Sequence, residues 1–61
     1  MEKALVDFLK KHYGNFESAT VTKDTGKTVW VTVDFGDDEI IKVTINRRKG
    51  ENGNYRIVTE A

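Results

Sequence analysis

Hydrophobic and polar residues alternate almost without interruption between positions 28 and 35. Val29, Val31, Val33 and Phe35 fall on one side of this stretch, whereas the other side carries threonine, aspartate and Trp30. A period of two predicts a β-strand with one apolar face. The rest of the chain is interpreted as what covers the valine side, and nothing in the pattern says what covers the side of Trp30.

The N-terminal segment follows a helical period instead. Its apolar stripe, at i, i+3, i+4 and i+7, consists of Leu5, Phe8, Leu9 and His12. This spacing predicts a helix from Glu2 to Tyr13, with the His12 ring packed at the edge of the core. Gly14 is expected to end the helix in a left-handed conformation.

Period two resumes after Phe16 and predicts a first strand over residues 17–23. The segment Asp24-Thr25-Gly26 suits a three-residue hairpin loop with Gly26 left-handed. This loop would set the register between the first two strands. The expected cross-strand pairs are Lys23 with Lys27, Val21 with Val29, Thr20 with Trp30 and Ala19 with Val31.

A second turn is predicted at Gly36-Asp37-Asp38, followed by a strand over residues 39–48. The expected pairs are Phe35 with Glu39, Val33 with Ile41, Val31 with Val43 and Val29 with Ile45. Asn52-Gly53 favours a two-residue third turn, but that turn would oppose mismatched faces. We therefore expect a longer or bulged loop within residues 49–53, with Tyr55 and Ile57 facing inward and the last strand ending near Glu60.

The elements predict a single α+β domain over residues 1–61, in which an N-terminal helix packs on one face of a four-stranded antiparallel meander. Short connections favour the strand order 1-2-3-4. A chain of 61 residues buries only about 60% of its unfolded surface, which leaves room for one core. The expected core residues are Leu5, Phe8, Leu9, Ala19, Val21, Val29, Val31, Val33, Phe35, Ile41, Val43, Ile45, Tyr55 and Ile57.

Composition narrows the function classes. Ten acidic and ten basic residues give zero net charge, so overall electrostatics favour neither nucleic acid nor a membrane surface. No cysteine is present, which is compatible with a cytoplasmic location, and no apolar run approaches the ~20 residues of a membrane span. We expect no cofactor, no metal and no membrane contact.

Two surfaces could bind a partner. On the sheet face of Trp30, one cross-strand row is expected to hold Thr20, Trp30, Thr44 and Arg56, and the next row Thr32, Lys42 and Val58, with Ile40 near one end. This face is either an ordinary solvated surface, with Arg56 in a cation–π contact with the indole, or an interface. Tryptophan and arginine are typical of interface hot spots, which makes Trp30 the first candidate.

Charges also segregate between the two ends of the predicted sheet. One end collects Lys23, Lys27, Arg47, Arg48 and Lys49, offset by Asp24 and Glu51; the other collects Glu17, Asp34, Asp37, Asp38, Glu39 and Glu60. Edge and loop solubility explains such clusters. Alternatives are a phosphate contact at residues 47–49 and a basic partner, or a hard cation, at the acidic end.

Catalytic chemistry has little support in the sequence. The chain has one histidine, one serine and no cysteine, and no base is placed to activate Ser18. Asp37 and Asp38 read as turn residues rather than as an acid–base pair, and the acidic spacing does not match an EF-hand.

We therefore expect a non-enzymatic module that binds a protein partner or a second copy of itself through the Trp30 face or a strand edge. The residues of that site would be Trp30, Arg56, Thr44, Lys42, Val58 and Ile40. A single-stranded nucleic-acid binder is the alternative, with Trp30 as stacking platform and Lys42, Arg47, Arg48, Lys49 and Arg56 along the phosphates. The regular pattern also permits an engineered scaffold without a natural partner.

Overall fold

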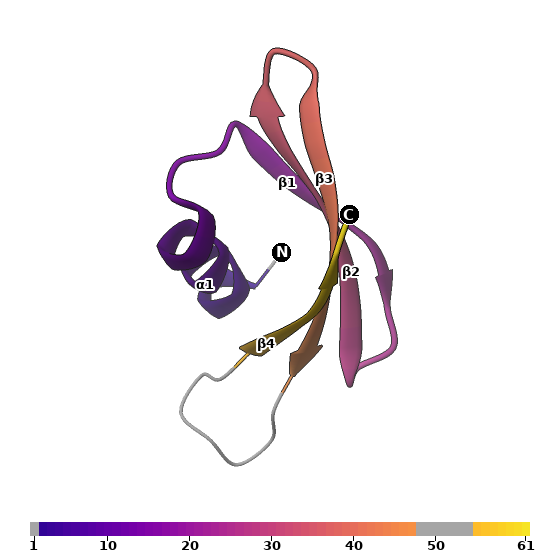
Figure 1. The fold of residues 1–61 in the computed structure, drawn as a ribbon. Helices are drawn as coiled ribbons and strands as arrows, with labels where there is room; N and C mark the ends of the chain where they lie inside the picture. The colour runs from indigo at the N-terminus through magenta and orange to yellow at the C-terminus, as the bar shows by residue number, and fades with distance from the viewer. Residues whose placement is uncertain (1, 48–54) are drawn as a thin grey trace.

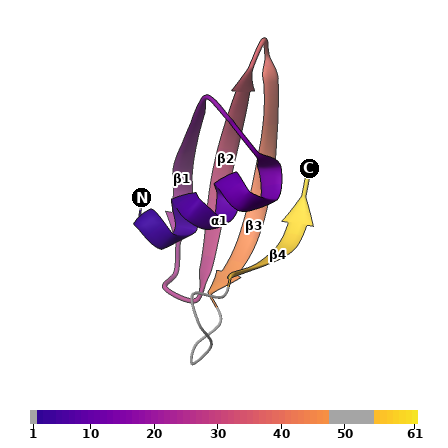
Figure 2. The same ribbon diagram turned by 90° about the vertical axis from the view of Figure 1, so that its left-hand side faces the viewer.

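The computed structural model describes residues 2–47 and 55–61, which form one helix and a four-stranded antiparallel sheet. Helix α1 spans Lys3–Tyr13, and the strands are β1 (Ser18–Asp24), β2 (Thr28–Gly36), β3 (Glu39–Arg47) and β4 (Tyr55–Glu60). The strand order is β1-β2-β3-β4, so the predicted helix-plus-meander fold is confirmed. The helix lies across one face of the sheet, and no described element covers the opposite face (Figures 1 and 2).

The helix packs by the stripe that its sequence predicts. Leu5 and Leu9 are fully buried against the sheet, and basic residues in the last turn suit the negative end of the helix dipole. Gly14 ends the helix with a positive φ of 78°, and its N–H donates to the carbonyl of Lys10. Its ψ of −145° lies outside the expected left-handed helical region. His12 lies at the edge of the core as expected: it is exposed, and its ring stacks on that of Phe8.

The core lies between α1 and the two central strands, β2 and β3. The fully buried residues are Leu5, Leu9, Val29, Val31, Val33, Val43 and Ile45. Partly buried residues pack around them: Phe8, Tyr13, Phe16, Ala19, Val21, Phe35, Ile41, Tyr55 and Ile57. Every expected core residue is in one of these two groups, and Tyr13 and Phe16 were missed.

The central hairpin has the predicted register. Val29 pairs with Ile45, Val31 with Val43, and Val33 with Ile41. The expected pair of Phe35 with Glu39 was wrong. An irregularity after Asp34 lets Gly36 pair with Glu39 instead, so the turn is shorter than expected. The two remaining turn residues both have positive φ, 54° and 64°, which is the geometry of a type I′ hairpin.

The predicted register of the first hairpin was wrong by two residues. Ala19 pairs with Val33 and Val21 with Val31, and the ladder then shifts at a bulge between Val21 and Lys23. Alternation fixes which residues share a face, but registers that differ by two satisfy it equally well. The bulge decided the outcome, and it moves the loop to residues 25–27, with Gly26 at φ 90°.

Strand β4 is also irregular. The expected rows put Tyr55 beside Ile45 and Ile57 beside Val43, which was wrong by two residues. Ile57 pairs with Ile45 and Tyr55 with Arg47, and a bulge then shifts the ladder so that Thr59 pairs with Thr44. The expected third turn within residues 49–53 and the end of the third strand at Arg48 fall outside the described residues.

Candidate interaction face

The sheet face that the helix leaves uncovered is called the open face, and it carries three cross-strand rows around Trp30. The central row holds Lys23, Trp30, Thr44 and Thr59; one flanking row holds Thr20, Thr32, Lys42 and Ala61, and the other Thr28, Asn46 and Arg56. The pairing of Trp30 with Thr44 is as predicted. Thr20 and Arg56 were wrongly expected in this row and lie in the flanking rows instead, because both edge ladders are shifted by bulges.

The bulge in β1 gives Trp30 a neighbour that the sequence did not suggest. Lys23 is shifted beside Trp30, and its Nζ lies 5.1 Å from the centroid of the indole ring. This is a cation–π distance, and it places the lysine ammonium group over the ring. The expected contact with Arg56 was wrong, since Arg56 pairs with Asn46 one row away. Trp30 is therefore half-buried although no second layer covers it.

The two exposed aliphatic residues of this region do not join Trp30 in one apolar patch. Ile40 is 54% exposed and pairs with Asp34, two rows from Trp30, towards the β2–β3 turn. Val58 is 50% exposed and lies within the β4 bulge, so its expected place beside Lys42 was wrong. Lys42 instead exchanges backbone hydrogen bonds with Ala61.

Both edges of the sheet carry a bulge. β1 and β4 are the outer strands of the sheet, and each contains a bulge that interrupts its regular extended backbone. A bulge twists an edge strand and interrupts its row of free N–H and C=O groups, which opposes the addition of a further strand. The open face is thus better suited to binding a partner than either edge strand is.

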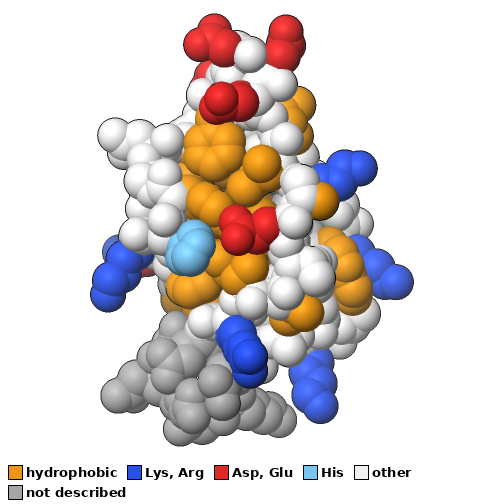
Figure 3. Space-filling model, in the orientation of Figure 1, with side chains coloured by type: hydrophobic (Ala, Val, Ile, Leu, Met, Phe, Trp, Pro, Cys, Tyr) orange, Lys and Arg blue, Asp and Glu red, His pale blue; other side chains and the backbone are white. Residues whose placement is uncertain are grey.

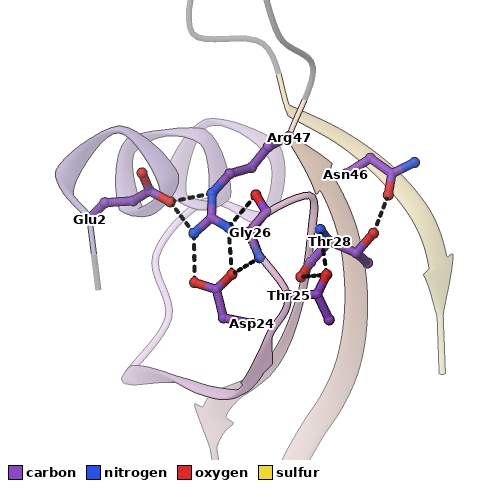
Figure 4. Close-up of polar contacts among 7 residues, drawn as sticks. All are labelled: Glu2, Asp24, Thr25, Gly26, Thr28, Asn46 and Arg47. Carbon is purple, nitrogen blue, oxygen red and sulfur yellow. Dashed lines mark hydrogen bonds and ion pairs between the residues drawn. The ribbon is translucent and has the colours of Figure 1, made fainter.

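Arg47, Glu2 and Asp24 form a cluster of ion pairs at the end of the sheet where the sequence suggested a phosphate contact (Figure 4). Arg47 donates from Nε to Glu2 Oε1 at 2.8 Å, from Nη1 to Asp24 Oδ1 at 2.6 Å and to the Gly26 carbonyl at 3.0 Å. Its Nη2 donates to Asp24 Oδ2 at 2.9 Å and lies 2.6 Å from Glu2 Oε1. All three guanidinium nitrogens are engaged, which leaves none to receive a phosphate.

The contacts within this cluster shift the pKa values of Asp24 and Arg47. The Arg47 hydrogen bonds, followed by the Gly26 N–H, lower the pKa of Asp24 from 3.8 to about 2. The hydrogen bonds that Arg47 donates to Asp24 and Glu2 raise the pKa of Arg47 further above its ordinary value. Arg48 and Lys49, the other residues of the suggested phosphate contact, fall outside the described residues.

A row of aromatic rings fills the gap between α1 and the β4 edge, and the sequence reasoning did not foresee it. Neighbouring rings lie 5.5 Å apart for Tyr55 and Phe8, 6.1 Å for Phe8 and His12, 4.6 Å for His12 and Tyr13, and 6.0 Å for Tyr13 and Phe35. Figure 3 views this side, where hydrophobic side chains lie between the helix and the sheet. One signal was present in the sequence: Tyr13 lies four residues after Leu9 and therefore on the same helical stripe.

The two tyrosines of this row have polar partners. The Tyr13 hydroxyl donates to Glu60 Oε2, and burial, with the Glu60 hydrogen bond and charge, raises the Tyr13 pKa well above 10. Burial followed by the charge of Glu2 raises the Tyr55 pKa as well. Both hydroxyls therefore favour the protonated form, and that of Tyr13 links the end of α1 to the Glu60 carboxylate on β4.

The aspartates at the acidic end of the sheet have structural roles in the β2–β3 turn. Asp34 Oδ1 accepts a hydrogen bond from the Gly36 N–H at 2.8 Å, while Asp37 and Asp38 are the positive-φ residues of the turn. Aspartate tolerates this conformation better than most residues. Among residues 2–47 and 55–61, no group of three or more histidine, aspartate or glutamate side chains could hold a metal ion.

Comparison with known proteins adds no relative: no family model, no curated protein and no solved structure matches the chain. In the described part of the chain, no helix has the length and apolar character to cross a membrane. Function must therefore be argued from the surface itself.

Proposed function

We propose that this protein is a non-enzymatic protein-interaction module, of the inhibitor or accessory type, that binds a protein partner through the open face around Trp30. The observation that carries the proposal is the position of Trp30. It lies in the middle row of a sheet face that no described element covers, on a central strand whose other face carries the buried Val29, Val31 and Val33.

The surroundings of Trp30 suit an interface hot spot. Tryptophan is among the residues that contribute most to binding, and it contributes most when it is held in place before the partner arrives. Lys23 contacts one part of the ring, and the Thr22 hydroxyl donates to the Trp30 carbonyl at 3.3 Å. The adjacent threonines add flat, stiff, β-branched surface that costs little side-chain entropy on binding.

Binding of a different protein at the open face is favoured over strand addition at an edge and over self-association. The bulges in β1 and β4 oppose strand addition at either edge. A two-fold dimer through the open face would bring Lys23, Lys42 and Arg56 against the same three residues of the other copy, and like charges in one interface oppose each other. A different protein is therefore the better partner.

Single-stranded nucleic acid is the weaker candidate. A stacking platform needs free aromatic rings, but Trp30 is the one aromatic residue of the open face and Lys23 covers part of it. The five other aromatic residues pack against the core on the helix side. Arg47, one of the residues expected along the phosphates, is engaged by Asp24 and Glu2.

The proposal is tested by comparing Trp30→Thr with Thr59→Ser. Threonine at position 30 keeps the strand preference of the site while it removes the indole, and Thr59→Ser makes a small change in the same row. Each variant is immobilised, and the proteins that it retains from a lysate are compared with those of the wild type. We expect Trp30→Thr to lose a partner that Thr59→Ser retains, and circular dichroism checks that both variants fold.

Two outcomes would contradict the proposal. One is a partner retained equally by Trp30→Thr and the wild type. The other is the absence of any retained protein, which would support an engineered scaffold without a natural partner.

A further inference from the structure

The central rows of the open face carry charges of one sign only. Lys23, Lys42 and Arg56 lie in these three rows, and no aspartate or glutamate does. Asp34 lies beyond these rows, opposite Ile40, and its carboxylate accepts a hydrogen bond from the Gly36 N–H. A chain with zero net charge therefore presents a basic surface around its one tryptophan.

The three basic residues surround Trp30 instead of forming a line. Lys23 lies on β1, Lys42 on β3 and Arg56 on β4, and each of the three rows contains one of them. Strands ~4.8 Å apart and residues ~3.4 Å apart along a strand put their Cα atoms roughly 12–16 Å from one another. Opposite charges at such spacing can flank an apolar contact with the indole without meeting each other.

These charges are available for a partner. Among the described residues, none of the three forms an ion pair, whereas Arg47 at the end of the sheet is engaged by two carboxylates. The side chains of Lys23, Lys42 and Arg56 are exposed. Exposed charges act over about 10 Å at moderate ionic strength, so the three fields overlap above Trp30.

We propose that the open face recognises an acidic protein surface, in which carboxylates face Lys23, Lys42 and Arg56 while an apolar group packs on Trp30. The proposal rests on the proposed function and specifies the chemistry of the partner. Carboxylates are favoured over nucleic-acid phosphates because successive bases stack on several aromatic rings, and the aromatic residues other than Trp30 pack against the core. Complementary charge would mainly raise the association rate and exclude basic partners.

The test uses two double variants with the same net charge. Lys42→Glu with Arg56→Glu reverses two charges of the open face and leaves Lys23 in contact with Trp30. Lys10→Glu with Lys11→Glu makes the same change on exposed residues of α1, away from the open face. The probes are a fluorescent short peptide of alternating glutamate and threonine, its lysine–threonine counterpart and oligothymidylate, all at low ionic strength.

We expect the wild type to bind the glutamate–threonine peptide with an affinity that falls as salt is added. The open-face variant should lose about tenfold or more of this affinity, and the helix variant much less. Equal losses in both variants, which would reflect net charge alone, would overturn the proposal. So would an acidic peptide that does not bind, or tighter binding of oligothymidylate, which would favour nucleic acid.

Failure of this inference differs from failure of the proposed function. If a captured partner depends on Trp30 but is retained equally by the open-face charge variant, the face binds a protein that is not chosen by its acidity. If the Trp30→Thr variant retains the same partners as the wild type, the open face is not the interaction site, regardless of the affinities measured for the peptides.

Discussion

The two faces of strand β2 differ in burial although they have the same backbone and alternate residue by residue. Val29, Val31 and Val33 are at most 1% exposed, whereas Trp30 and Thr32 between them are only half-buried. The helix makes this difference, because α1 covers one face and no described element covers the other (Figure 2). On the covered face packing explains every large side chain, and on the open face Trp30 has no such explanation.

The covered face is also held by polar contacts at both ends of the helix. Glu2, next to the first residue of α1, binds Arg47 of β3, and Tyr13, the last residue, donates to Glu60 of β4. Between these contacts, Leu5 and Leu9 supply the apolar packing. The helix is therefore fixed by its ends and its middle, whereas the open face keeps its charged groups free.

The largest expected contrast is between alanine substitutions at neighbouring positions 31 and 32. Val31→Ala should lower the free energy of unfolding by roughly 2–3 kcal/mol, because it removes two fully buried methyl groups and leaves a cavity. Thr32→Ala should cost about 1 kcal/mol or less, since it loses strand preference but little burial. Urea unfolding followed by circular dichroism measures both.

Both changes replace a β-branched side chain with alanine. The difference between their costs in unfolding free energy therefore reports the contribution of burial. The expected difference is a large part of a total stability of about 3–9 kcal/mol for a chain of this length. Equal costs at the two positions would mean that the open face is covered in solution.

A smaller effect is expected in alkaline solution, from the tyrosines on the covered side. The raised pKa values of Tyr13 and Tyr55 mean that the folded state favours the protonated form. Their contribution to stability is therefore complete below pH 10 and is lost as the pH rises above it. Tyrosinate absorbance near pH 10 should therefore show less ionisation in the folded protein than in urea.

These are the two tyrosines of the chain, so the titration has no other contributor. Tyr13→Phe serves as the control, because it should reduce the alkaline loss of stability. Ordinary titration of both groups in the folded protein would contradict the contacts with Glu60 and Glu2.

The smallest effect is expected in acid, from the exposed cluster at the end of the sheet. The pKa of Asp24 is lowered from 3.8 to about 2, so its contribution to stability is present above pH 4 and is lost as the pH falls towards 2. Arg47→Met removes the hydrogen bonds that cause the shift. The thermal midpoints of wild type and variant should therefore differ above pH 4 and converge towards pH 2, and a difference independent of pH would contradict this account.

Sequence periodicity was enough to predict the fold and the composition of the core. Period two and period 3.6 assigned each element, and the predicted partners of Val29, Val31 and Val33 on β3 were correct although the second turn is shorter than predicted. The candidate site was predicted less well. Trp30 and Thr44 were placed together correctly, but Arg56 and Val58 were assigned to the wrong rows, and Lys23 was missed.

What the sequence determined by itself is which residues share a face, because a one-residue slip would move a whole apolar set into water. Register in steps of two carries no such penalty, so the bulges of β1 and β4 and the loop geometry decided it. The same shifts decided that Lys23 lies over Trp30 and that Arg47 is paired with Asp24 and Glu2. Those contacts join residues far apart in the chain, and only the packed tertiary structure brings them within reach.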